Sequence, residues 1–160
     1  MLDFSTFTWI HTALSLVAVV AGIPVLLGLI GNRLSGGWTL VFIVTAAATS
    51  LTGFGFTGVP FGASHWVGVI CLVLLLVTIL ARYVFNLAGA WRAVYAVSLV
   101  TVVYFQLFVL IAQLFKKVPA LAARAPTLSE PPFAIAQVVL LVIFIALAVV
   151  AARSFRRAAA

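Results

Sequence analysis

The alternation of apolar and polar positions divides the chain into five long apolar stretches, separated by short segments rich in glycine, proline or charge. A helix needs about 20 mostly apolar residues to cross the hydrocarbon core of a membrane, and it satisfies its own backbone hydrogen bonds there. The pattern therefore predicts an all-α, integral membrane bundle that forms a single domain over residues 1–160. The five predicted transmembrane helices are residues 9–30, 38–56, 64–81, 93–114 and 133–152.

The segment between the second and third stretches decides between five spans and four. Read without a break, residues 38–81 are too long for a single crossing. An alternative with four spans, in which one of the two stretches is re-entrant, remains open. The pattern is interrupted by Gly53, Gly55, Gly58, Pro60 and Gly62.

Small and hydroxyl-bearing residues recur at helical spacing in the first three stretches. Such residues mark the faces through which helices associate in lipid. The clearest stripe advances by three or four residues along the third stretch and is expected to face inward: Gly68, Cys71, Leu75, Thr78 and Arg82. Most of the fifth stretch is plain Val, Leu, Ile, Phe and Ala, which is typical of a helix facing lipid or packed tightly.

Composition supports the membrane assignment. Hydrophobic residues make up 66% of the chain and charged residues 7%, whereas soluble domains have about half and a quarter. The formal net charge of +7 does not indicate nucleic acid, because the basic residues lie at segment ends rather than in a patch interleaved with aromatics. The four tryptophans lie at the boundaries of spans, where indole rings prefer to sit: Trp9, Trp38, Trp66 and Trp91.

The basic residues also predict an orientation, because Lys and Arg accumulate in cytoplasmic segments. With five spans, one side of the membrane holds six arginines and no acid: Arg33, Arg82, Arg92, Arg153, Arg156 and Arg157. The other side holds both signs of charge: Lys116, Lys117, Arg124, Asp3 and Glu130. We therefore expect the N-terminus outside and the C-terminus inside.

Several kinds of chemistry lack the residues that they need. The chain has no Asp or Glu in any predicted span, so carboxylate-based proton coupling has no group to act through. It also lacks the motifs of serine hydrolases, zinc proteases and phosphate-binding loops. The single cysteine, Cys71, excludes a disulfide framework and a thiolate metal cluster. No catalytic residue is assigned, and no enzyme is predicted.

Six polar side chains are the candidate binding residues, and we expect an outward polar face in which Gln106 lies two turns deeper than Gln113 and Tyr104 lies near mid-membrane. They come from four spans: His11, His65, Tyr104, Gln106, Gln113 and Gln137. Gln106 precedes Gln113 by seven residues on the same side of the fourth span, so the two amides would line a track from outside. The alternative is that each amide bonds a neighbouring helix and each histidine lies in the wet interface.

The two histidines allow a second hypothesis. Neutral imidazoles on facing helices can ligate haem or another transition metal, which would make the protein a redox subunit that uses His11 and His65. No other cofactor or metal is predicted. The proline-rich outer segment at residues 116–132 is a further candidate, either as a lid over the polar face or as a docking surface.

Several segments resemble a group of small uncharacterised multi-pass inner-membrane proteins of proteobacteria. The resemblance lies in residues 37–39, 48–54, 81–83, 87–92 and 125–133. It implies a bacterial inner (plasma) membrane and supplies no site residue. The sequence thus predicts a small membrane protein that binds a lipophilic molecule or serves as an accessory subunit. Its expected partners are membrane lipids and either further copies of itself or another membrane protein, without nucleic acid.

Overall fold

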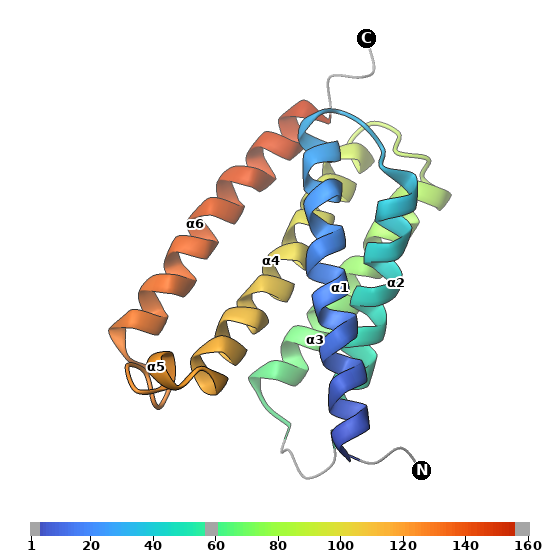
Figure 1. Ribbon diagram of the computed structural model, residues 1–160. Helices are drawn as coiled ribbons and strands as arrows, with labels where there is room; N and C mark the ends of the chain where they lie inside the picture. Colours follow the sequence, from blue (N-terminus) through green and yellow to red (C-terminus); the bar gives the residue numbers. More distant parts are fainter. Residues whose placement is uncertain (1–3, 57–60, 156–160) are drawn as a thin grey trace.

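The computed structural model describes residues 4–56 and 61–155, which form helices joined by turns. The all-α prediction is confirmed for these residues. Five of the helices are long and apolar enough to cross a membrane, as the hydropathy pattern predicts. The helices, shown in Figure 1, are α1 (Phe4–Ile30), α2 (Gly36–Gly53), α3 (Ala63–Ile79), α4 (Trp91–Lys117), the short α5 (Pro119–Ala122) and α6 (Pro131–Ser154).

The ends of several helices differ from the predicted ones. Helix α2 ends at Gly53 instead of residue 56, because the chain turns there and the Gly55 N–H bonds to the Thr52 carbonyl at 3.0 Å. Helix α4 continues to Lys117, since lysines in the last turn of a helix interact favourably with the negative end of its dipole. The segment between α4 and α6 is therefore shorter than the predicted outer loop, and it contains α5.

Helices α2 and α3 are separate and lie side by side, which favours five spans over four. Two of the residues expected to break the pattern, Gly58 and Pro60, lie outside the described residues, as do Asp3, Arg156 and Arg157. The third apolar stretch ends in a π-helical turn, η1 (Leu80–Val84), which directly continues α3.

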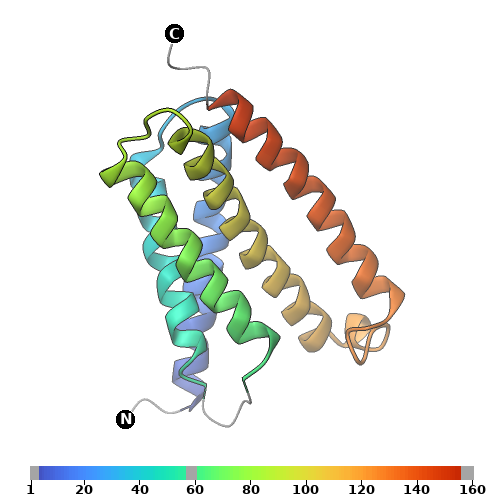
Figure 2. The same ribbon diagram turned by 180° about the vertical axis from the view of Figure 1, so that it is seen from behind.

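The five long helices form a bundle in which α1 packs along α2, α3 lies between α2 and α4, and α6 covers the far side of α4 (Figure 2). Helix α4 provides the centre of the core, because Tyr95, Leu99 and Val100 are fully buried. The inward stripe predicted for α3 is confirmed, since Cys71, Leu75 and Thr78 are buried. Most side chains of α6 are exposed, as expected for a helix that faces lipid.

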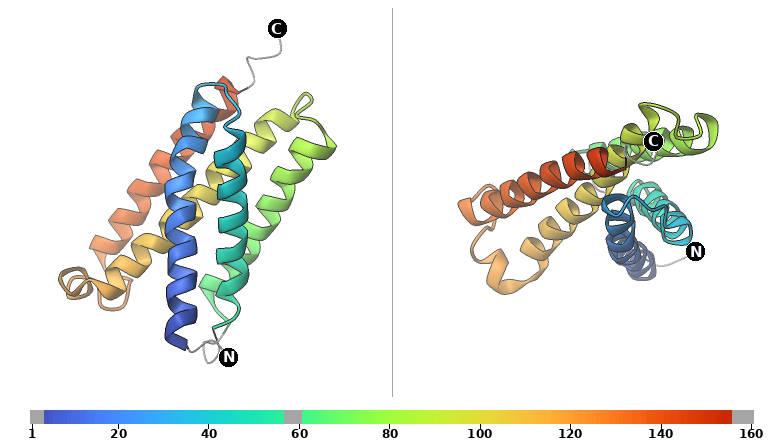
Figure 3. Two further views of the ribbon diagram at one scale, coloured as in Figure 1. Left: turned by 45° about the vertical axis from the view of Figure 1, so that its right-hand side comes forward. Right: turned by 90° about the horizontal axis from the view of Figure 1, so that it is seen from above.

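Helices α1 and α4 approach closely at one level and diverge from there. A Cβ added at Gly22 would lie 3.1 Å from both methyl groups of Val103, so only glycine fits this contact without displacement. Ala18 and Ala21 on α1 are also fully or almost fully buried. Figure 3 shows α4 and α6 leaning away from α1 and α2 toward the end of the bundle that holds the N-terminus. The divergence leaves space between α1, α3 and α4.

The opposite end of the bundle is held together by two arginines. The Arg82 guanidinium, in η1, donates a hydrogen bond of 3.1 Å to the hydroxyl of the buried Tyr95. Arg92, at the start of α4, donates to the backbone carbonyl of Phe155 at 3.4 Å and lies over its ring. These contacts join η1, α4 and Phe155, which follows α6, at this end of the bundle.

The packing at Gly22 predicts a sharp difference between two glycine substitutions. Gly22→Leu forces the added side chain into Val103 and should lower the free energy of unfolding by about 1–3 kcal/mol through overpacking. Gly37→Leu is the matched control, because an added Cβ there meets no atom within 4 Å. Thermal unfolding of the detergent-purified variants measures both. Equal midpoints for the two variants would show that α1 and α4 do not meet at Gly22.

Candidate functional site

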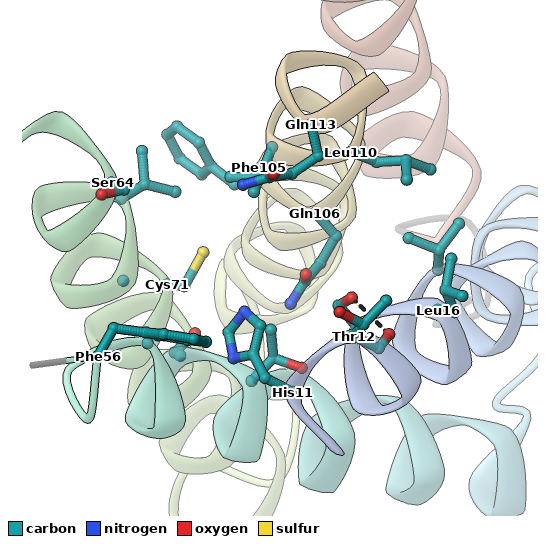
Figure 4. A pocket seen from close by; sticks show the side chains of 18 of the residues that line it. His11, Thr12, Leu16, Phe56, Ser64, Cys71, Phe105, Gln106, Leu110 and Gln113 are labelled. Carbon is teal, nitrogen blue, oxygen red and sulfur yellow. Dashed lines mark hydrogen bonds between the residues drawn. The ribbon is translucent and has the colours of Figure 1, made fainter. Parts of the chain in front are cut away.

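A cavity of about 570 Å³ lies where α1, α3 and α4 diverge, with α2 at its back. Its volume falls within the range of about 300–1,000 Å³ that is typical of sites for small molecules. Figure 4 shows side chains from all four helices pointing into it. Most of the lining is apolar and comes from residues such as Leu16, Val19, Phe56, Phe105 and Leu110.

The cavity brings together four of the six predicted binding residues: His11, His65, Gln106 and Gln113. The other two lie elsewhere, so the single face expected from the sequence is divided. Tyr104 is two residues from Gln106, roughly 200° around the helix, and packs against Phe108 and Phe144. Gln137 lies on α6 and donates from Nε2 to the Phe108 carbonyl at 3.1 Å.

Gln106 is the unusual residue of the cavity. Its side chain is 6% exposed, yet its amide forms no hydrogen bond with any other described residue. Figure 4 shows the amide directed into the cavity, toward the imidazole of His11. The residue as a whole is buried, but its amide atoms are not among the fully buried atoms without a partner, so they reach the open space of the cavity. The Gln106 amide can therefore bond to whatever occupies the cavity.

Thr52 favours one tautomer of His11. The Nδ1 atom of His11 lies 2.8 Å from Thr52 Oγ1, which also lies 2.7 Å from the Ala48 carbonyl and 3.1 Å from the Thr49 carbonyl. A hydroxyl has one hydrogen, so while Thr52 donates to either carbonyl it can only accept from His11. This arrangement favours the neutral imidazole with its proton on Nδ1 and a lone pair on Nε2. Phe56 packs its ring against this imidazole, with 5.1 Å between centroids.

His65 has the opposite arrangement. The Gly62 N–H donates to His65 Nδ1 at 3.2 Å, so the proton of the neutral ring is on Nε2. Phe61 stacks on the same ring with 4.9 Å between centroids. Axial ligation of haem by two imidazoles requires a lone pair from each ring. Because the free nitrogen of His65 is a donor, the arrangement does not favour the haem hypothesis, which stays a prediction.

The other hydroxyls of α1 at the cavity are already engaged. Thr12 donates to the Thr8 carbonyl and Ser15 to the Thr12 carbonyl, each at 2.8 Å. Both hydroxyls are therefore unavailable as donors to a bound molecule. The polar groups that remain in the cavity lining include the His11 imidazole, the Gln106 amide and the hydroxyl of Thr49, whose buried oxygen has no partner among the described residues.

The candidate binding residues chosen from the sequence omit several residues that line the cavity. Cys71 was expected to face inward and in fact lines the cavity, and Lys116 and Lys117 form part of its rim with Gln113. The lysines were detectable, because Lys117 follows Gln113 by four residues on the same face of one helix. The role of Thr52 was not detectable, since it depends on how α1 and α2 pack.

Of the segment predicted as a lid or docking surface, residues 116–132, only Lys116 and Lys117 line the cavity. Within this loop the Glu130 carboxylate accepts hydrogen bonds from Thr127 Oγ1 at 2.8 Å and from the Ser129 N–H at 3.1 Å. Glu130 is the only acid among residues 4–56 and 61–155, so no described carboxylate lines the cavity.

Comparisons of the chain with models of known protein families, with curated proteins and with solved structures found no match. The resemblance to small proteobacterial inner-membrane proteins therefore stays a prediction.

The outer loop should keep its shape in mild acid. Desolvation raises the pKa of Glu130, but hydrogen bonds from Thr127 and Ser129 outweigh it and hold the pKa below 4.5. A lowered pKa means that the stabilising contacts are complete above 4.5 and are lost only as the pH falls through the lower folded value. NMR shifts of the Thr127 and Ser129 amides should titrate with a midpoint below 4.5. They should not titrate in Glu130→Gln, and a midpoint above 4.5 in the native chain would contradict the loop geometry.

Proposed function

We propose that this chain is a five-span protein of a bacterial inner membrane whose cavity binds a lipophilic small molecule. The observation that carries the proposal is the amide of Gln106, which belongs to a buried residue, lacks a partner among the described residues and points into a cavity of about 570 Å³. His11 lines the same cavity, and its contact with Thr52 favours a lone pair on Nε2. A small molecule with one polar group would satisfy both side chains.

The exposure of the cavity between α1 and α4 supports the proposal that the ligand enters from the lipid. Leu16 of α1 and Leu114 of α4 both line the cavity, and they are 47% and 43% exposed. Exposed leucines on these two helices face hydrocarbon if the bundle spans a membrane. A lipophilic molecule can then move between the bilayer and the cavity without crossing water. The lysines at the rim would meet the headgroup layer, where Lys side chains are well tolerated.

The proposed orientation has the N-terminus and the cavity on the outer side. It is supported by the position of the arginines, because Arg33, Arg82, Arg92 and Arg153 all belong to the end of the bundle opposite the cavity. The accessory-subunit role and the association with a second copy or another membrane protein stay predictions from the sequence.

Reporter fusions test the orientation. A periplasmic alkaline phosphatase fused after Thr127, in the loop between α5 and α6, should be active, because this loop lies at the cavity end. A fusion after Asn86, at the arginine end, should be inactive, and a cytoplasmic fluorescent reporter should give the reverse pattern. Activity of the phosphatase at Asn86 instead of Thr127 would contradict the proposed orientation.

Native mass spectrometry tests ligand binding. Protein extracted gently from its host membrane should carry a bound lipophilic molecule of defined mass, and Gln106→Leu should lose most of it, because the ligand's polar group is left without its amide partner. Gln137→Leu is the matched control, since Gln137 bonds to the Phe108 carbonyl and does not line the cavity. Retention of the same mass by Gln106→Leu, or its absence from the native chain, would contradict the proposal.

A further inference from the structure

The geometry of the cavity points to the chemical class of its ligand: we infer that the bound molecule carries a hydroxyl group on a lipophilic body. The hydroxyl would bridge the Nε2 atom of His11 and the side-chain amide of Gln106. This inference rests on the proposed function, because it names the ligand of the same site.

The tautomer of His11 determines what the ligand has to offer. Thr52 Oγ1 lies 2.8 Å from His11 Nδ1 and 2.7 Å from the Ala48 carbonyl, and donation to that carbonyl favours the imidazole proton on Nδ1. In this tautomer the Nε2 atom accepts a hydrogen bond and cannot donate one. A ligand that satisfies Nε2 has to bring a hydrogen-bond donor.

The Gln106 amide supplies the complementary group. It carries an NH₂ donor and a carbonyl acceptor, and Figure 4 shows it pointing toward the His11 imidazole. A hydroxyl group donates its single hydrogen to His11 Nε2 and accepts from the Gln106 NH₂ with the same oxygen. One atom of the ligand thus satisfies both side chains.

Other polar groups fit the two residues less well. A carboxylate or a ketone has no hydrogen to donate, so its oxygen lone pairs would face the lone pair of His11. A cationic amine can donate, but the rim carries Lys116 and Lys117, and no described acid lines the cavity to balance another positive charge. His11 and Gln106 therefore select a neutral hydrogen-bond donor. A hydroxyl is the smallest such group that is also an acceptor.

The rest of the lining requires an apolar body. Phe56 stands beside the imidazole, and Phe105, Val19 and Leu110 continue the apolar surface toward the exposed Leu16. A hydroxyl compound bound in this way would place its oxygen at Gln106 and its hydrocarbon part against these side chains. Its far end would reach the lipid between α1 and α4.

Two probes that differ only at the oxygen test this inference. 4-Octylphenol has the hydroxyl, and 4-octylanisole has the same body with the hydrogen replaced by a methyl group. Equilibrium binding of the radiolabelled probes to the full chain in lipid nanodiscs, with empty nanodiscs as the background, should show the phenol bound roughly tenfold more tightly. Decanoate, an anion of comparable length, should bind more weakly than the phenol.

Two variants connect the preference to the proposed contacts. Thr52→Val removes the acceptor that favours the proton on His11 Nδ1, so the preference for the phenol over the anisole should fall several-fold. Gln137→Leu should leave the preference unchanged, because this residue lies outside the cavity. The comparison of probes on the native chain is complete without either variant, so a variant that fails to fold leaves the test intact.

The possible failures can be told apart. Equal binding of the phenol and the anisole, with both lost in Gln106→Leu, would overturn the inference that the ligand carries a hydroxyl group. The proposed function of the cavity would then still stand. Tighter binding of decanoate would overturn the inference as well and would assign the site to an amphiphilic anion. Binding of all three probes no greater than to empty nanodiscs would overturn both the inference and the proposed function.

Discussion

Hydrocarbon offers no hydrogen-bond partners, so each polar group on a spanning helix has to find one within the protein or in a bound molecule. Most hydroxyls with a described hydrogen bond donate to a carbonyl of their own helix. Thr78, for example, donates to the carbonyl four residues earlier at 2.8 Å. Gln137 finds the Phe108 carbonyl of a neighbouring helix. The side chain of Gln106 has no such partner among the described residues, and neither has the buried hydroxyl of Thr49, which lines the same cavity. The functional interpretation of the cavity depends on the Gln106 amide.

The packing of the bundle explains how the Gln106 amide can face an open space. Gly22 brings α1 against Val103 of α4, and from this contact the two helices diverge toward the N-terminal end of α1. Arg82 and Arg92 join the elements at the other end. A bundle that is tight at one end and open at the other leaves room beside Gln106, which is close to the point of divergence because it follows Val103 by three residues.

Much of the fold was predictable because membrane helices obey a length and composition rule. The spans, the inward stripe of Cys71 and Thr78, and the exposed α6 all follow from patterns within single helices. The division of the polar residues was not predictable, since it depends on which side of α4 each neighbour takes. The contact of His11 with Thr52 joins residues 41 positions apart, and only the packed structure brings them together. The ends of α2 and α4 depend on turn and charge effects that span prediction ignores.

An experimental density map of the full chain in nanodiscs made directly from its host membrane tests the central claim most directly. The account predicts non-protein density in contact with both the Gln106 amide and His11 Nε2, continuing toward the gap between Leu16 and Leu114. A map in which α1 and α4 close together, with the Gln106 amide bonded to a neighbouring helix and no density beside it, would contradict the account.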